Sequence, residues 1–351
     1  MGVLNEKILV PMNEPTENPP IETVSVPDFK NRSTGLTIFG ILTLLMGCIV
    51  GLMVPLMLVG MAAGAAAKNP NMPPTPLSGF LCGVLLYGGL AVALVWLGIG
   101  SIMARRWARA LMVIFSWAWL VCGIIMVIVM GLILPKIWEN MPAQNGRPAM
   151  PPGAITAMTI FMVLFMSFFF VLLPAIWTFF YSSRHVKATC EMRDPVMRWT
   201  DACPLPVLAL CLWLLIAVPF MLLMPVLYHG VAPFFGMFLS GLPGSLLCLA
   251  AAALWAYCAW RLYKMDVRGW WLILIAMLVW TVSSMMTYMR HDMLEMYQLM
   301  GYPQAQIDQM QKLGVFSGNS MGWIMLLGMV PFLGYMLFVK KYLPGGKVAQ
   351  A

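Results

Sequence analysis

The chain has 351 residues, of which 61% are hydrophobic and only 10% are charged, and its formal net charge is +8. A soluble domain carries about 25% charged residues, so this composition excludes an ordinary water-soluble protein. The basic residues stand in short segments beside apolar runs and form no single basic face. This distribution argues against nucleic acid as a partner.

The first 34 residues are acidic and proline-rich, and they lack the continuous apolar region of a signal peptide. Such a composition cannot bury enough apolar surface to fold. We therefore expect residues 1–34 to form a disordered tail.

Apolar runs of about twenty residues recur after this tail, and a helix of that length crosses the roughly 30 Å hydrocarbon core of a bilayer. Turn-forming segments rich in proline, glycine and asparagine separate them. The predicted fold class is all-α, a polytopic transmembrane helical bundle. The eight expected spans cover residues 35–62, 78–102, 108–134, 154–182, 205–228, 232–260, 269–290 and 320–339.

The Lys and Arg residues predict the orientation of these spans, because cytoplasmic loops are enriched in basic residues. With the N-terminus inside, 16 Lys and Arg residues fall on the cytoplasmic side and 5 on the opposite side. Both termini are therefore expected to be cytoplasmic.

The two halves of the chain resemble each other. "ARRWARALMVIFSW" follows the second span and "DVRGWWLILIAMLVW" follows the sixth, which pairs Arg105 with Arg268 and Trp107 with Trp270. A unit of four spans begins and ends on one side of the membrane, so two such units must be parallel. We predict repeats over residues 35–184 and 205–345, a cytoplasmic connector over 185–204 and a short tail over 346–351.

The connector reads "HVKATCEMRDPVMRWTDACP" and contains three candidate metal ligands, His185, Cys190 and Cys203. Structural zinc sites use four ligands, usually with a close cysteine pair, and this spacing provides no close pair. The cytoplasm also keeps thiols reduced, which disfavours a disulfide between the two cysteines. Alternatively, neighbouring bases would lower the pKa of Cys190, and His185 would act as its base.

A hinge explains more residues of the connector. Asp194 and Pro195 predict a turn, Trp199 is expected at the membrane interface, and Thr200 or Asp201 is expected to cap the helix that follows. We therefore predict a connecting segment with no catalytic role.

"HVKATCEMRDPVMRWTDACPLPVLAL" together with "GIGSIMARRWARAL" resembles a group of uncharacterised bacterial multi-pass membrane proteins. The resemblance covers both repeats. It implies a bacterial inner membrane and carries no activity that could be transferred to this chain.

Away from their ends, the predicted spans contain no Asp, Glu, Lys, Arg, His, Asn or Gln. Such residues mark ion paths and proton relays, so a pump or a proton-coupled transporter is excluded. The densest polar group could line a neutral pathway, although such side chains more often bond to their own helix or join helices. It consists of Thr281, Ser283, Ser284, Thr287 and Tyr288.

The last outer loop, residues 291–318, is predicted to form two short helices, the first ending at Gly301 and the second beginning near Pro303. A stripe of methionines precedes and enters it beside His291. Thioether sulfurs suit Cu(I), but a methionine stripe ordinarily packs against a neighbour. The candidate copper ligands are Met289, Met293, Met296 and His291.

Three functions remain after these exclusions. The first is a non-catalytic structural or accessory subunit whose partners are the lipid bilayer and other membrane or periplasmic proteins. The second is a passive transporter or channel for neutral or hydrophobic molecules. The third is a metal-dependent sensor or enzyme that uses the connector. We find no convergent catalytic constellation and expect no cofactor.

Overall fold

The computed structural model describes residues 29–67, 77–139, 151–313 and 318–344. Contacts divide the chain into the units Met1–Lys30 and Asn31–Ala351, and the helices and strands that the structure describes belong to the second unit. The tails predicted for residues 1–34 and 346–351 lie largely outside the described residues. Ser33 and Thr34 already belong to the first helix.

Four spans form the first half, and their bounds lie within a few residues of the prediction. Pro174 lacks a backbone N–H, and the fourth span changes to π-helical bonding just before it. The elements are α1 (Ser33–Ala67), α2 (Leu77–Ile102), α3 (Arg106–Glu139), α4 (Pro152–Ser167), the π-helical turn η2 (Phe168–Leu172) and α5 (Leu173–Ser182).

The second half follows the short helix α6 (Arg184–Arg193) and the 3-10 turn η3 (Trp199–Asp201). Two short helices lie between its third and fourth long helices, within the residues 291–318 where two were predicted. The elements are α7 (Leu205–Leu227), α8 (Gly241–Tyr263), α9 (Val267–Tyr288), α10 (Met293–Leu299), α11 (Gln304–Leu313) and α12 (Gly318–Lys340).

Seven helical segments of the described chain are long and apolar enough to cross a membrane. The eighth predicted span corresponds to α12, which has 23 residues and contains the shorter apolar stretch Gly328–Lys340. The predicted fold class, an all-α polytopic helical bundle, is confirmed.

The sixth predicted span is wrong at its beginning. It was expected from residue 232, but α8 begins at Gly241, after an antiparallel hairpin of β1 (Ala232–Phe234) and β2 (Met237–Leu239). Gly236 occupies the left-handed region at φ +94°, which permits the tight turn between the strands. Hydropathy alone cannot distinguish such an apolar hairpin from the start of an apolar helix.

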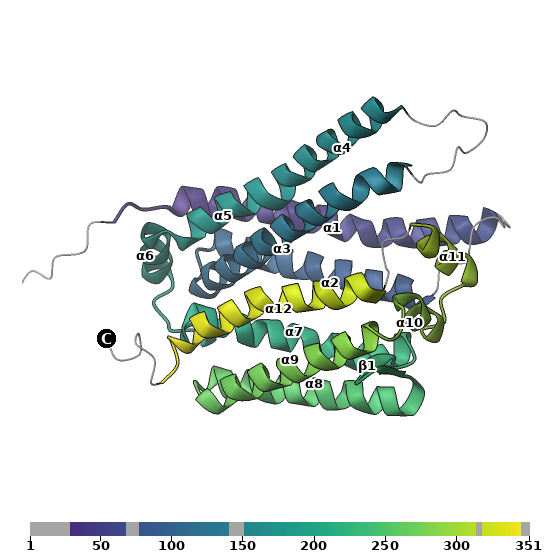
Figure 1. Ribbon diagram of the computed structural model, residues 1–351. Coiled ribbons are helices and arrows are strands. Elements are labelled where there is room, and N and C mark those ends of the chain that lie inside the picture. The colour runs from purple at the N-terminus through teal and green to yellow at the C-terminus, as the bar shows by residue number, and fades with distance from the viewer. Residues whose placement is uncertain (1–28, 68–76, 140–150, 314–317, 345–351) are drawn as a thin grey trace, which may run out of the picture. The chain divides into compact units, whose positions relative to one another are not determined.

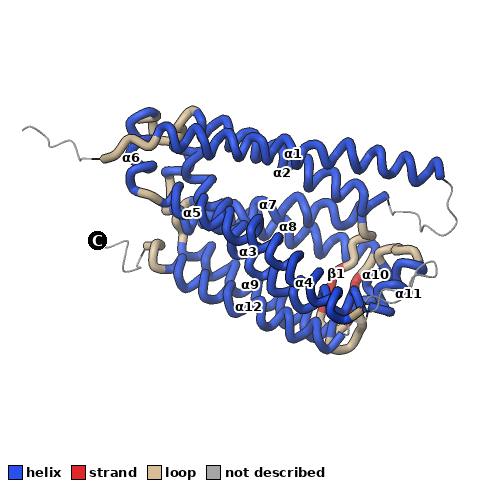
Figure 2. The backbone as a smooth tube through the Cα atoms, turned by 90° about the horizontal axis from the view of Figure 1, so that it is seen from above, coloured by secondary structure: helices blue, strands red, loops and turns tan. Residues whose placement is uncertain are grey.

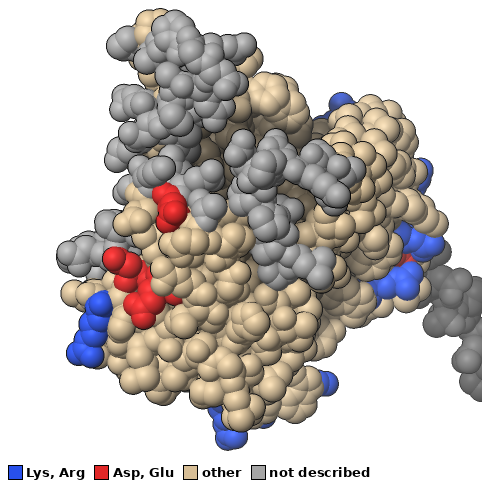
Figure 3. Space-filling view, turned by 90° about the vertical axis from the view of Figure 1, so that its right-hand side faces the viewer, with Lys and Arg blue, Asp and Glu red and all other residues tan. Residues whose placement is uncertain are grey.

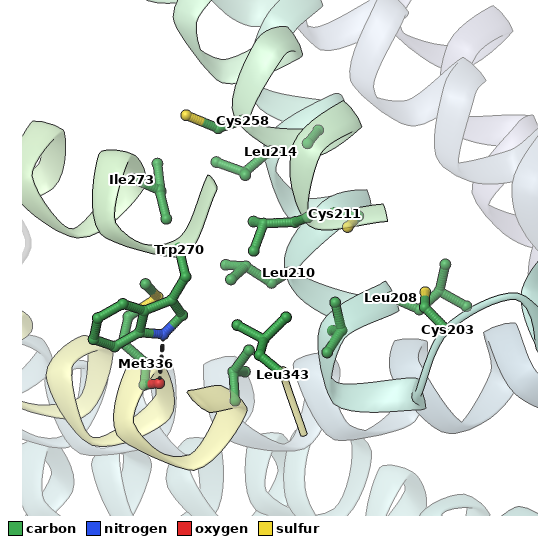
Figure 4. Close-up of a cluster of buried hydrophobic side chains, with 14 of the residues drawn as sticks. Cys203, Leu208, Leu210, Cys211, Leu214, Cys258, Trp270, Ile273, Met336 and Leu343 are labelled. Carbon is green, nitrogen blue, oxygen red and sulfur yellow. Dashed lines mark hydrogen bonds between the residues drawn. The ribbon is translucent and has the colours of Figure 1, made fainter. Parts of the chain in front are cut away.

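The helices pack as pairs of sequence neighbours in each half. The main contacts join α1 with α2, α3 with α4 and α5, α7 with α8, and α9 with α12. Each half has its own buried cluster, around Trp177 and Tyr181 in the first and around Trp270 and Met336 in the second (Figure 4). Leu205, the first residue of α7, packs against both clusters.

The connecting elements gather at two opposite ends of these helices. Figure 1 shows α6 at the same end as the last turn of α12, and β1, α10 and α11 at the other end. The view from above in Figure 2 shows the same separation. The connector and the β-hairpin therefore lie at different ends of the helices.

Helices α1 and α2 approach closely through three glycines. A Cβ atom built on Gly98 would lie 2.8 Å from the Leu44 nitrogen and 2.9 Å from the Gly40 oxygen, and one on Gly47 would lie 2.9 Å from Val95. Small residues allow this approach, which is a common basis of helix association in membranes.

We expect Gly98→Val to reduce the free energy of unfolding by about 1–3 kcal/mol, because the added side chain would force two backbones apart. The matched control is Gly89→Val on the same helix, where a Cβ atom meets nothing within 4 Å. Titration with a denaturing detergent measures both. Equal stability of the two variants would contradict the close contact.

Candidate functional site

The connector is a helix for half of its length and not only a loop. Helix α6 begins after Ser183, whose hydroxyl accepts a hydrogen bond from the His185 N–H at 3.3 Å. It ends at Asp194, before Pro195, as the predicted turn required. The sequence of α6 shows little apolar periodicity, because charged residues alternate along it and only Val186, Thr189 and Cys190 are buried.

Asp194 fixes the connector to the turn between α2 and α3. Its side chain is only 3% exposed, and its two oxygens accept hydrogen bonds from the Arg198 guanidinium at 2.9 and 3.3 Å. The Arg105 guanidinium lies 3.8 Å from this carboxylate. The hydrogen bonds from Arg198 are the main reason that the pKa of Asp194 lies below its usual range.

Arg106 connects α3 to two further acids of the connector. Its guanidinium lies 3.6 Å from Glu191 and 3.3 Å from Asp201. The prediction that Thr200 or Asp201 caps α7 is wrong, because the N-cap of α7 is Pro204 and no side chain caps it. Asp201 instead accepts a hydrogen bond from the Arg198 N–H at 2.9 Å and so closes the 3-10 turn.

A cavity of about 440 Å³ lies between α3, α6 and the segment that leads into α7. We call it the connector cavity. Its charged lining comes from three bases and two acids, and the remainder is mostly small or apolar. The lining residues are Arg106, Arg109, Ala110, Lys187, Cys190, Glu191, Met197, Thr200, Asp201, Ala202, Cys203, Pro204 and Leu205.

Two of the three candidate zinc ligands line this cavity. Cys190 and Cys203 both do so, whereas His185 is not among the lining residues. Burial is the main cause that raises the pKa of each thiol to about 11. The alternative in which basic neighbours lower the pKa of Cys190 gains no support, because the loss of solvent outweighs their charges.

Both cysteines are free thiols. Within the described part of the chain, no three His, Cys, Asp or Glu side chains lie close enough to hold a metal ion. The structure thus does not bring His185, Cys190 and Cys203 together as one ligand set.

The polar group of α9 makes bonds inside its own half of the chain. Thr281 donates to the Met277 carbonyl of its own helix at 2.8 Å. Ser283 accepts from the Phe235 N–H at 2.9 Å and Thr287 accepts from the Gly236 N–H at 3.0 Å. These hydroxyls satisfy the backbone of the β-hairpin turn, while Ser284 is buried beside them and the Tyr288 hydroxyl donates to the Met296 sulfur at 3.2 Å.

His291 and the methionine stripe occupy the end that carries the hairpin. His291 Nδ1 lies 2.8 Å from Glu295, and its Nε2 lies 3.1 Å from the Gly236 oxygen. Met289 is exposed, whereas Met296 is buried. Figure 3 shows this end from outside, with acidic side chains among mostly uncharged atoms. His291 thus joins α10 to the turn of the β-hairpin. Copper binding by these residues stays a hypothesis.

No family model, curated protein or solved structure matches this chain.

Sequence reasoning missed Arg109 and Thr200 as members of one site. Arg109 lies one turn into α3, and Thr200 is 2% exposed in the connector about ninety residues later. The only signal for the first was the excess of bases in "ARRWAR", which equally fits orientation of the helix in the membrane. Their proximity depends on how α6 and η3 pack on α3.

We expect Asp194→Asn to lower the free energy of unfolding by about 1–3 kcal/mol, since the Arg198 guanidinium loses a charged acceptor. The folded-state pKa lies below the ordinary 3.8, so this contribution is complete above that pH and is lost as pH falls through the folded value. The difference between the variant and the original protein should therefore shrink below about pH 3.8.

Detergent-denaturation curves over a pH series measure this difference. Asp308→Asn is the control, because Asp308 is an exposed acid of α11 that accepts a hydrogen bond from the neutral side chain of Gln304 on the same helix. A variant at Asp194 as stable as the control at neutral pH would contradict the role of the carboxylate.

Proposed function

We propose that the chain is a non-catalytic integral membrane protein that acts through lateral contacts, as a structural or accessory subunit of a membrane assembly. The observation that carries this proposal is an exposed stripe of aromatic rings that runs along α4 into η2. Phe161, Phe165 and Phe169 follow one another at intervals of four residues, so they share one helix face. Successive ring centroids are 6.3 and 5.0 Å apart.

This stripe belongs to a helix pair with few neighbours. The main contacts of α4 are with α3 and η2, and Figure 1 shows α4 rising away from the other helices. In the most apolar stretch of α3 only 6% is buried inside the protein, whereas in that of α8 39% is buried. Lipid can cover such a surface. A row of rings also offers van der Waals packing to a second helix, and such packing joins transmembrane helices because the hydrophobic effect does not drive their association within lipid.

The two alternatives have less support. A passive pathway along α9 would need its hydroxyls free to meet a solute, and Thr281, Ser283 and Thr287 are engaged in bonds within the fold. A Cys/His sensor would need reactive thiols, and the pKa of Cys190 is raised to about 11.

A photo-reactive amino acid in place of Phe165 should form an adduct with a protein in intact membranes, because this ring is 52% exposed on the stripe. The same residue in place of Trp213, which is 62% exposed on α7, is the control and should react with lipid. Native mass measurement after gentle extraction should show an assembly heavier than the 39.0 kDa chain. A lone monomer with only lipid adducts at both positions would refute the proposal.

We also propose that the protein lies in a bacterial inner membrane with both termini in the cytoplasm. The support is the clustering of bases at the connector end, where Arg105, Arg106, Lys187 and Arg198 lie together. The positive-inside rule assigns such an end to the cytoplasm, and the resemblance of the sequence to bacterial membrane proteins agrees with it.

The two halves are further proposed to be parallel repeats, on the basis of matching turns. Ala104 and Met265 have φ of +50° and +60° in the turns before α3 and α9. Each turn is closed by the same two backbone bonds, one over three residues and one over five, which is a Schellman motif. The matching turns align Ala104 with Met265. This alignment is shifted by two residues from the sequence pairing of Arg105 with Arg268.

A side-chain bond repeats in the same register. Five residues after Ala104, Arg109 Nε donates to the Tyr181 carbonyl at 2.9 Å. Five residues after Met265, Trp270 Nε1 donates to the Met336 carbonyl at 2.8 Å. In each half, then, the third span is tied to a backbone carbonyl of the last span.

Reporter fusions test the orientation and the repeat together. Alkaline phosphatase, which is active only outside the cytoplasm, should be inactive when fused after Arg105 or after Asp266 and active when fused after His291. Opposite activities at Arg105 and Asp266 would exclude parallel repeats. Activity at both would reverse the orientation.

A further inference from the structure

The charges of the connector cavity do not all cancel. Arg106 lies within 3.6 Å of both lining acids, Glu191 and Asp201, and Lys187 lies 3.9 Å from Glu191. Among the described residues, no acid forms an ion pair with Arg109 as Glu191 and Asp201 do with Arg106. Three bases against two acids leave one positive charge, and the geometry assigns it to Arg109.

Arg109 also has unused donors. Its Nε donates to the Tyr181 carbonyl at 2.9 Å, which holds the guanidinium plane against the end of α5. The two terminal nitrogens have no hydrogen-bond partner among the described residues, although the side chain lines the cavity. A guanidinium presents five N–H donors in a fixed plane, so four remain for a ligand.

Thr200 provides a second, independent observation. The residue is 2% exposed and lines the cavity, yet its hydroxyl has no hydrogen-bond partner in the described structure. Buried polar atoms are rarely left unpaired. A hydroxyl in this position lacks a partner that a bound ligand would supply.

The size and position of the cavity limit the class of ligand. A volume of about 440 Å³ accommodates a small molecule or one headgroup. The cavity lies at the first residues of two apolar segments, Arg106–Pro135 and Leu205–Leu227. The ends of such segments are expected at the depth of lipid headgroups. A single excess positive charge matches a singly charged anion, and a phosphodiester carries one negative charge.

We propose that the connector cavity binds a singly charged phosphate group, with the terminal nitrogens of Arg109 as paired donors and the Thr200 hydroxyl as a further donor. Arginine recognises phosphate through two parallel N–H···O bonds. Lys187, which is exposed at the rim, adds charge without fixed geometry. The phosphate can belong to a phospholipid headgroup or to a soluble anion, and both present the same oxygens.

The test uses the purified full-length chain in mild detergent with two probes. Native mass spectrometry measures retention of added phosphatidylglycerol. Thermal unfolding at about pH 5, where inorganic phosphate is mostly singly charged, measures stabilisation by this anion against chloride at equal ionic strength. We expect Arg109→Gln to reduce the response at least about tenfold. Arg193→Gln is the matched control, because Arg193 is an exposed base of α6 outside the cavity lining.

Each result has one meaning. Retained lipid that phosphate does not displace identifies a headgroup site, whereas stabilisation by phosphate alone identifies a soluble anion, and both support the proposal. No response to either probe, or equal losses in Arg109→Gln and Arg193→Gln, would overturn it. If Arg109→Gln does not fold, Thr200→Val removes one donor at nearly constant shape and should weaken binding severalfold. An unchanged response in that variant would equally overturn the proposal.

Discussion

Hydrocarbon offers no hydrogen-bond partners, and this constraint governs the whole arrangement of the chain. A backbone in that medium must satisfy its own polar groups, which only helices and closed barrels do. The long helices α1, α2, α3, α7, α8 and α9 meet this requirement within themselves. Charged side chains are therefore confined to helix ends, where the connector and the outer elements lie.

The two ends solve the same pairing problem in different ways. At the connector end, carboxylates such as Asp194 and Asp201 are matched with guanidinium groups of the α2–α3 turn and of the connector itself. At the other end, Ser283 and Thr287 of α9 accept the N–H groups of the β-hairpin turn. The cavity of the connector end thus lies within a charged network.

The start of α3 and the start of α9 illustrate how one structural problem receives two solutions. Asp266 caps α9 from within its own turn, accepting from the Arg268 N–H at 2.8 Å. The equivalent position before α3 is Arg105, whose side chain cannot accept a hydrogen bond, and the Asp194 carboxylate of the connector lies 3.8 Å from its guanidinium. An acid at a helix N-terminus is favourable in either case. Because Asp194 belongs to the connector, its contact with Arg105 also fixes the connector to the first half of the chain.

The sequence by itself determined the membrane class, the positions of the spans and the two short helices after α9, because hydropathy and turn residues act over short distances. It did not determine the hairpin at Ala232–Leu239, the helical state of α6 or the association of Arg109 with Thr200. Those features depend on partners distant in the chain, such as Ser283 for the hairpin and Arg106 for the connector. Only the tertiary structure decided them, since the free energy of a buried polar group depends on which partner the packing brings within hydrogen-bond distance.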